Sequence, residues 1–411
     1  MKRTLTHTAI ATMVGAGLGL VSAMASLGIA TFFARKIITP EHEKEDDVEI
    51  TAVDFDAMTV TFAANPDSLA PGRYGVWTDR GVGHFRVGEV ISTDATSRKM
   101  DEHRVTRKLL GVDAGEVEVG TARWNAYFHA GDPRSALGLE YENVLIASEV
   151  GGLPTWHIKP VEVTEHNGTW AILVHGRSAR REETLRAVPV LHGEGFNILV
   201  PMYRNDLGAP SSVDGRYNLG LSEWRDVEAA MKYALTQGAK EIILFGWSMG
   251  GATVLQTLDR SQLSNHVSAA VLDGPVIDWG DVITFQAQTN RLPWPADSLA
   301  KMLLSQNFSR SLVGVAEPID IGVTNWVRRA NELSHPLLVI HSSADHVVPC
   351  APSRALANKR PDLVTFAEWE HALHCREWNV DSARWERVVC DFLGSQRSLL
   401  GSGSAASAHV S

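Results

Sequence analysis

The stretch Phe245-Gly246-Trp247-Ser248-Met249-Gly250-Gly251 lies between an apolar run, residues 241–245, and an amphipathic run that begins at Ala252. A serine with glycines two residues to either side, placed between a strand and a helix, is typical of the strained turn that raises a hydroxyl above an α/β sheet. The glycines leave room for backbone that would otherwise collide. The five-residue pattern alone also fits a plain glycine-rich turn, so the prediction of a nucleophile at Ser248 depends on the flanking chain.

Composition indicates a globular protein of more than one average domain. The chain has 411 residues, of which 44% are hydrophobic and 21% charged, with a net charge of −10. This charge, without a basic stripe that would neutralise many phosphates, argues against a nucleic-acid partner. The three cysteines, Cys350, Cys375 and Cys390, have no metal-ligand spacing and form no disulfide framework. We interpret them as inert thiols, with a Cys350–Cys375 bridge as the alternative.

The N-terminal segment is apolar and almost uncharged. No Asp, Glu, Lys or Arg occurs between Arg3 and Arg35, and residues 8–34 exceed the roughly 20 residues that a helix needs to cross a bilayer. We predict a membrane anchor in residues 1–36 of a single-pass cell-membrane protein, with the globular part outside the cytoplasm. A signal peptide cleaved near Ala23-Met24-Ala25 is the alternative, but the apolar run continues beyond that site, through Phe33.

Residues 37–141 show a different pattern, in which an acidic linker is followed by short stretches of alternating apolar and polar residues. The segments 49–53, 58–62, 73–77 and 84–91 alternate apolar and polar residues and are separated by turn sequences. This pattern predicts half-buried antiparallel strands in a small β-rich domain. No group of residues there indicates a chemical activity.

A second domain is expected over residues 142–395. Residues 170–174 read as a strand ending in His175-Gly176-Arg177-Ser178, and a helical stretch and a second strand follow, which predicts a βαβ unit in a mainly parallel sheet. Acyl transfer places negative charge on a carbonyl oxygen, so two backbone N–H donors lower its barrier. We predict Met249 and Arg177 as these oxyanion-hole donors, with Ser178 as the alternative to Arg177.

The chain after the serine supplies an acid and a base. Residues 278–333 read as a helical cap, and residues 396–411 as a disordered tail. The buried strand 337–340 leads to Asp345, and the strand 364–369 leads to His371 and His374. A serine hydroxyl needs an imidazole to accept its proton, and a carboxylate to orient that imidazole. The order Ser248, Asp345, His374, each after its own strand, fits an α/β sheet of this kind.

In these motifs the chain resembles the α/β-hydrolase fold family, close to its serine aminopeptidase and prolyl oligopeptidase-like branches and to membrane-anchored actinobacterial members. The resemblance covers residues 142–393. In the family pattern the histidine precedes a Trp-Asn pair, here Trp378-Asn379, by about four residues, which favours His374 over His371. Some members take the acid from the preceding strand, which makes Asp273 the alternative to Asp345.

The resemblance implies a doubly wound, mainly parallel sheet and a two-step acyl transfer from a small-molecule carboxylic ester or a peptide. It implies neither a cofactor nor a metal. An acyltransferase or thioesterase would use the same three residues with a different acceptor or substrate. A non-catalytic, membrane-tethered binding protein on a hydrolase scaffold is the alternative from a different class.

Overall fold

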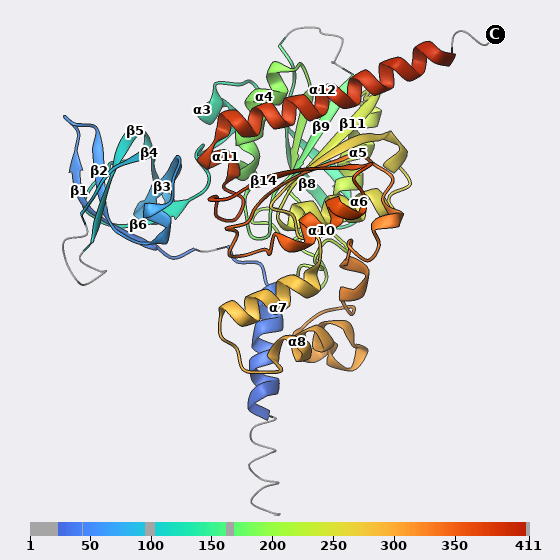
Figure 1. The fold of residues 1–411 in the computed structure, drawn as a ribbon, viewed down its shortest axis with the longest axis horizontal. Coiled ribbons are helices and arrows are strands. Elements are labelled where there is room, and N and C mark those ends of the chain that lie inside the picture. Colours follow the sequence, from blue (N-terminus) through green and yellow to red (C-terminus); the bar gives the residue numbers. More distant parts are fainter. Residues whose placement is uncertain (1–23, 43, 95–102, 162–167, 408–411) are drawn as a thin grey trace, which may run out of the picture.

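The computed structural model describes residues 24–407 apart from 43, 95–102 and 162–167. Figure 1 shows three parts: a small β barrel, a larger unit built on a twisted sheet, and a helical cap beside the N-terminal helix. The N-terminal helix comprises residues 24–38.

The barrel confirms the predicted β-rich domain. Its six strands close in the order β1-β2-β5-β4-β3-β6, and its core contains Phe62, Tyr74, Phe85 and Trp124. The alternating pattern arises because inward and outward side chains alternate along each strand. The strands are β1 Val48–Asp54, β2 Thr59–Ala63, β3 Tyr74–Thr78, β4 Gly83–Asp94, β5 Arg104–Ala114 and β6 Gly120–Asn125.

The larger unit has an eight-stranded sheet in the order β14-β13-β12-β11-β9-β10-β8-β7, parallel from β14 to β10. Its strands are β7 Glu142–Ser148, β8 Gly151–Ile158, β9 Thr169–Val174, β10 Asn197–Pro201, β11 Glu241–Trp247, β12 Val267–Asp273, β13 Leu337–Ser342 and β14 Val364–Trp369. The chain leaves β9 towards β10 and leaves β11 towards β12, in opposite directions along the sheet. Ligand sites in open α/β sheets lie at such a switch point.

Helices cover both faces of this sheet. On one face, α5 (Trp224–Thr236), α6 (Met249–Arg260) and α10 (Ala351–Lys359) share one apolar core. On the other face, α4 (Val188–Gly193) and α12 (Ser382–Ser407) share a second core. Helix α12 continues to Ser407, past residue 396, where the predicted disordered tail begins. No proline interrupts this stretch, and the helix continues past the end that its apolar pattern indicated.

The cap contains α7 (Trp279–Thr289), α8 (Ala296–Ser305) and the short α9 (Arg310–Val313). The N-terminal helix packs into the core that includes this cap, with Ala30, Ala34 and Ile38 fully buried (Figure 1). The last turns of the predicted membrane span therefore contact protein. Among the described residues, no helix has the length and apolar character needed to cross a membrane. Residues 1–23, which hold most of the predicted span, lie outside that part.

The barrel docks on the loop between β14 and α12, residues 370–381, which we call the histidine loop. Asn379 exchanges hydrogen bonds with the backbone of Arg73, at 3.0 Å to the Arg73 N–H and 2.7 Å to its carbonyl. Arg376 pairs with Asp67 of the barrel at 2.6 Å. The Arg73 guanidinium lies 4.1 Å from the centre of the Trp378 ring. These contacts tie the barrel to the segment that carries His374.

A buried arginine fixes the barrel loop that makes this contact. Arg107 is fully buried and donates to the carbonyls of Gly88, Ser68, Ala70 and Gly72, at 2.6–2.9 Å. Burial lowers its pKa to about 10, so it stays charged at neutral pH. Its charge is balanced by carbonyl dipoles.

We expect Arg107→Met to lower the free energy of unfolding of the barrel by about 3 kcal/mol, because buried carbonyls lose their donors. Chemical denaturation measures this loss. The comparison is Lys108→Met, which changes the exposed neighbouring cation. Equal unfolding midpoints for the two variants would contradict the structural role of Arg107.

Candidate active site

Ser248 stands in a strained turn between β11 and α6. Its backbone angles are φ 52° and ψ −116°, a conformation that is rare for residues other than glycine. A Cβ atom on Gly250 would lie 2.1 Å from the carbonyl oxygen of Val174, and one on Gly246 would lie 2.6 Å from the carbonyl oxygen of Gly250. Both positions therefore require glycine. The turn holds the half-exposed hydroxyl of Ser248 at the carboxyl edge of the sheet.

The structure brings the three predicted catalytic residues together. His374 Nε2 lies 2.9 Å from Ser248 Oγ, and His374 Nδ1 lies 2.6 Å from Asp345 Oδ2. With Nδ1–H donating to the carboxylate, Nε2 is free to accept the serine proton. The arrangement can activate the hydroxyl as a nucleophile.

Asp345 is held by donors on both carboxylate oxygens. Its Oδ1 accepts from the backbone N–H groups of Val347 and Val348, at 2.8 and 2.9 Å. A second histidine, His341, places Nε2 3.2 Å from Oδ2. Burial raises the pKa of Asp345, but the charge of His374 and hydrogen bonds from both histidines outweigh burial and hold the pKa below its usual range. Asp345 is therefore ionised, and its orientation is fixed.

Asp345 also sets the protonation of His374. Burial lowers the pKa of His374, but the charge and hydrogen bond of Asp345 outweigh burial and raise the pKa above its ordinary value. A raised pKa makes the imidazole a stronger base once it is neutral, and it stabilises the imidazolium formed during proton transfer.

The alternatives from the sequence lie elsewhere. Asp273 accepts a hydrogen bond from Trp385 Nε1 at 2.9 Å. The side chain of His371 is 79% exposed and lies beside Glu370. No hydrogen bond joins either of them to the Ser248 side chain among the described residues. Neither Cys350 nor Cys375 belongs to a disulfide, so no Cys350–Cys375 bridge forms. No group of three or more metal-ligating side chains was found in the described part of the chain.

The two backbone N–H groups predicted as oxyanion-hole donors belong to residues next to Ser248 and next to Gly176 in the chain. Gly176 packs against the serine, since a Cβ on Gly176 would lie 3.2 Å from Ser248 Cβ. The N–H groups of Met249 and Arg177 have no hydrogen-bond acceptor among the described residues. Ser178, the alternative donor, already donates its N–H to Tyr217 Oη at 3.2 Å. The geometry therefore favours the pair Met249 and Arg177.

The side chain of Arg177 has a structural contact that the sequence did not reveal. It donates to the carbonyls of Lys36, Ile37 and Thr39, at 2.6, 2.7 and 3.1 Å, at the C-terminal end of the N-terminal helix. A cation there satisfies carbonyls that have no partner within the helix and complements the helix dipole. Arg177 thus joins the N-terminal helix to the proposed oxyanion loop. Local sequence does not reveal this contact, because Arg177 and Ile37 are 140 residues apart.

An apolar cavity of about 280 Å³ lies between the N-terminal helix and α7. Phe32 and Phe33 line it from the helix, Trp279 and Ile283 line it from α7, and Arg177 lies at its wall. The same arginine thus contacts the cavity and belongs to the loop beside Ser248.

Comparisons with known proteins identify the family. Residues 171–401, more than half of the chain, match the model of the alpha/beta hydrolase family, and residues 49–125 match a domain of unknown function, DUF8805. The chain belongs to the alpha/beta hydrolase family, as its resemblance to the α/β-hydrolase fold predicted.

Individual similarities are distant. The chain is 23% identical to the uncharacterized protein YfhR of Escherichia coli K12 over 244 residues, which cover 58% of this chain and 75% of YfhR. Among solved structures, the Pyrococcus furiosus esterase Pf2001 shares 22% identity, with a TM-score of 0.49, and the match covers 65% of this chain and 94% of that one. Est1E from Butyrivibrio proteoclasticus, solved with ferulic acid, shares 17% identity, with a TM-score of 0.48, and the match covers 62% and 99%.

The raised pKa of His374 predicts the pH dependence of activity. A protonated imidazole cannot accept the serine proton, so kcat/KM should fall on the acid side through an apparent pKa above about 6.5, the ordinary value for histidine. Asp345→Asn should shift the acid-side fall in kcat/KM to lower pH and reduce kcat by about 10³–10⁴-fold. A pH profile with a neutral nitrophenyl ester measures both effects. A larger effect in Asp273→Asn than in Asp345→Asn would contradict the assignment of the acid.

Proposed function

We propose that the protein is a membrane-anchored serine hydrolase that cleaves a carboxylic ester through an acyl-enzyme. The observation that carries the proposal is the unbroken hydrogen-bond chain from Asp345 through His374 to Ser248 Oγ. The two unoccupied N–H groups of Met249 and Arg177 beside the serine add the second requirement of acyl transfer.

In the proposed reaction, Ser248 Oγ attacks the ester carbonyl while His374 Nε2 takes the hydroxyl proton. The N–H groups of Met249 and Arg177 stabilise the resulting oxyanion. As the intermediate collapses, the ester C–O bond breaks and His374 returns the proton to the leaving alcohol. A water molecule then attacks the acyl-enzyme, with His374 again as the base, and releases the carboxylic acid and free Ser248.

We propose that the apolar cavity beside Arg177 accepts an apolar group of the ester, since Phe32, Phe33 and Trp279 line it together with the polar Gln286 and Asn290. Esters are therefore proposed before peptides as substrates.

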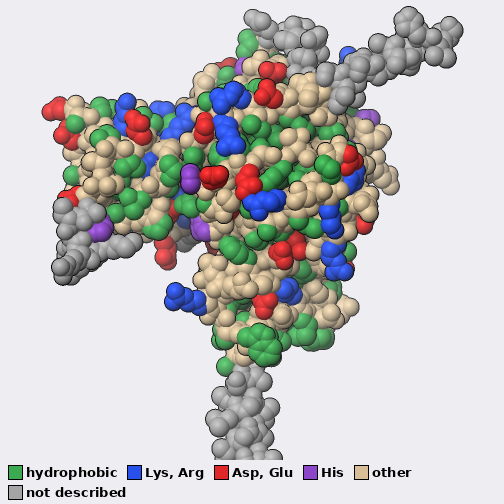
Figure 2. Space-filling model, viewed as in Figure 1, with side chains coloured by type: hydrophobic (Ala, Val, Ile, Leu, Met, Phe, Trp, Pro, Cys, Tyr) green, Lys and Arg blue, Asp and Glu red, His purple; other side chains and the backbone are tan. Residues whose placement is uncertain are grey.

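Exposed apolar side chains support the membrane part of the proposal. Met24 and Phe32 on the N-terminal helix are 72% and 71% exposed, and Trp294 and Phe308 on the cap are 89% and 72% exposed. Figure 2 shows hydrophobic side chains at the tip of the cap. Tryptophan is enriched at membrane interfaces, and residues 30–34 of the uncharged run 8–34 pack beside the cap. We propose that the cap faces the bilayer from outside the cytoplasm.

A fluorophosphonate probe tests the catalytic proposal. It should label the wild-type protein and the Ser343→Ala control, which changes an exposed serine, and it should fail to label Ser248→Ala. Hydrolysis of a short-chain nitrophenyl ester should fall by at least about 10³-fold in Ser248→Ala. Folded wild-type protein that neither reacts with the probe nor hydrolyses the ester would overturn the proposal in favour of a non-catalytic binding protein.

A further inference from the structure

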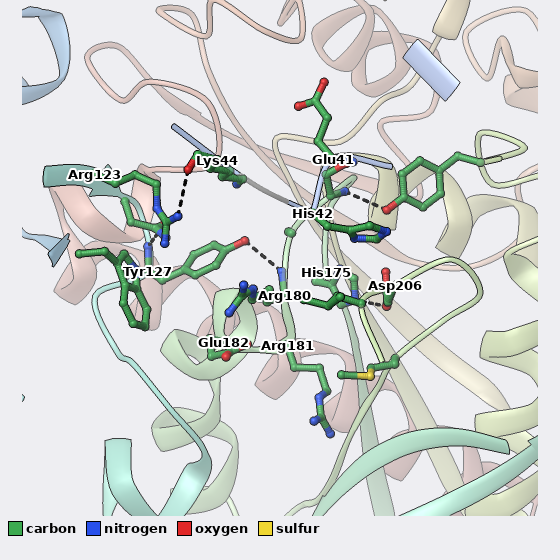
Figure 3. Close-up of a pocket in the computed structure, with 17 residues that line it drawn as sticks. Glu41, His42, Lys44, Arg123, Tyr127, His175, Arg180, Arg181, Glu182 and Asp206 are labelled. Atoms are coloured by element: carbon green, nitrogen blue, oxygen red, sulfur yellow. Dashed lines mark hydrogen bonds and ion pairs between the residues drawn. The ribbon is translucent and has the colours of Figure 1, made fainter. Parts of the chain in front are cut away.

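A second cavity lies where the barrel meets the hydrolase unit (Figure 3), and we call it the junction cavity. Its volume is about 160 Å³. The barrel contributes Trp77 and Arg123, the linker before β1 contributes Lys44, and the loop after β9 contributes Arg180 and Arg181. The apolar cavity described above shares none of these residues.

Several donors at the junction cavity have no acceptor. Trp77 Nε1, Arg123 Nε and Arg181 Nη1 are buried atoms without a hydrogen-bond partner among the described residues. A buried donor without a partner costs about 1–3 kcal/mol, and most such groups in folded proteins are satisfied. The Arg123 guanidinium lies 5.8 Å from the Trp77 ring, so these two residues offer neighbouring donors for an acceptor in the cavity, whereas the Arg181 guanidinium lies 4.0 Å over the Trp156 ring.

Positive charge at the junction cavity is also uncompensated. Within the described part of the chain, Lys44, Arg123, Arg180 and Arg181 form no ion pair within 4.0 Å. Burial lowers the pKa of Lys44, and the positive charges of Arg123 and Arg180 lower it further, against the opposing effects of Glu183 and Glu41. In Figure 3 these three cations gather around the Tyr127 ring.

The nearby acids have other partners. Glu41 lies 3.4 Å from Arg177, and Asp206 lies 2.8 Å from His175. Glu183 accepts from the N–H of Gly176 at 2.7 Å and lies 3.8 Å from Arg186. Glu182 is the further acid that lines the cavity. Cations therefore outnumber the acids that are left to balance them.

We propose that the junction cavity binds a small oxyanion, a carboxylate or a phosphate, between the barrel and the hydrolase unit. Arginine, lysine and indole N–H groups supply only donors, which suits the oxygens of such an anion. The ligand is either a free anion or the charged end of the ester substrate. The charged end of the ester is included because Ser178, two residues after Gly176, also lines the cavity. This second source of the anion rests on the proposed function.

The binding test uses the Ser248→Ala protein, so its outcome does not depend on catalysis. Phosphate and succinate should raise the melting temperature above that in sodium chloride at the same ionic strength. Arg123→Gln and Arg180→Gln, one from each side of the junction, should each weaken this binding by about tenfold or more. The control Lys108→Gln removes an exposed barrel cation that does not line the cavity.

The second arm identifies the source of the anion. It compares kcat/KM for mono-4-nitrophenyl succinate with that for 4-nitrophenyl butyrate in the catalytically intact protein. If the anion is part of the substrate, the ratio of the two values should fall at least about tenfold in Arg123→Gln and Arg180→Gln but not in Lys108→Gln. If the ligand is a free anion, the two arginine substitutions should reduce the rise in melting temperature but leave the ratio of kcat/KM values unchanged. The proposal is overturned if neither measurement distinguishes the arginine variants from Lys108→Gln.

Discussion

The close approach of the first turn of α6 to the end of β9 is the constraint on which the site depends. The approach is possible because Gly250 has no side chain, since a Cβ atom there would lie 2.1 Å from the Val174 carbonyl oxygen. It places Ser248 beside Gly176, next to which Arg177 is a proposed oxyanion donor together with Met249. The strained angles of Ser248 follow from the same turn. The reactive hydroxyl and the oxyanion donors are therefore positioned by one packing contact between backbones.

The barrel also helps to position the base, His374. The histidine loop hydrogen-bonds to the barrel through Asn379, and Arg376 pairs with Asp67. On the other side of the site, the Arg177 side chain holds the end of the N-terminal helix. The barrel and the N-terminal helix thus each contact a loop that carries a proposed catalytic group. This arrangement gives the barrel and the N-terminal helix a physical route by which they affect the hydrolase site.

Much of the site was predictable because its chemistry follows local patterns. Glycine spacing indicated Ser248, and buried apolar strands indicated Asp345 and the pair His371 and His374, because such strands end at one edge of a parallel sheet. The resemblance to the α/β-hydrolase family then favoured His374. Closure of the barrel, the contact of Arg177 with the N-terminal helix and the junction cavity were not predictable, since each depends on residues far apart in sequence.

The most direct test of the central claim, that Ser248 forms an acyl-enzyme, is rapid-quench mass spectrometry during turnover of a nitrophenyl ester. The account predicts a burst of nitrophenol close to one equivalent per active protein, if deacylation is slower than acylation, together with an acyl adduct on the peptide that contains Ser248. An adduct on another residue, or equal rates of nitrophenol release from the wild-type protein and from Ser248→Ala, would contradict it.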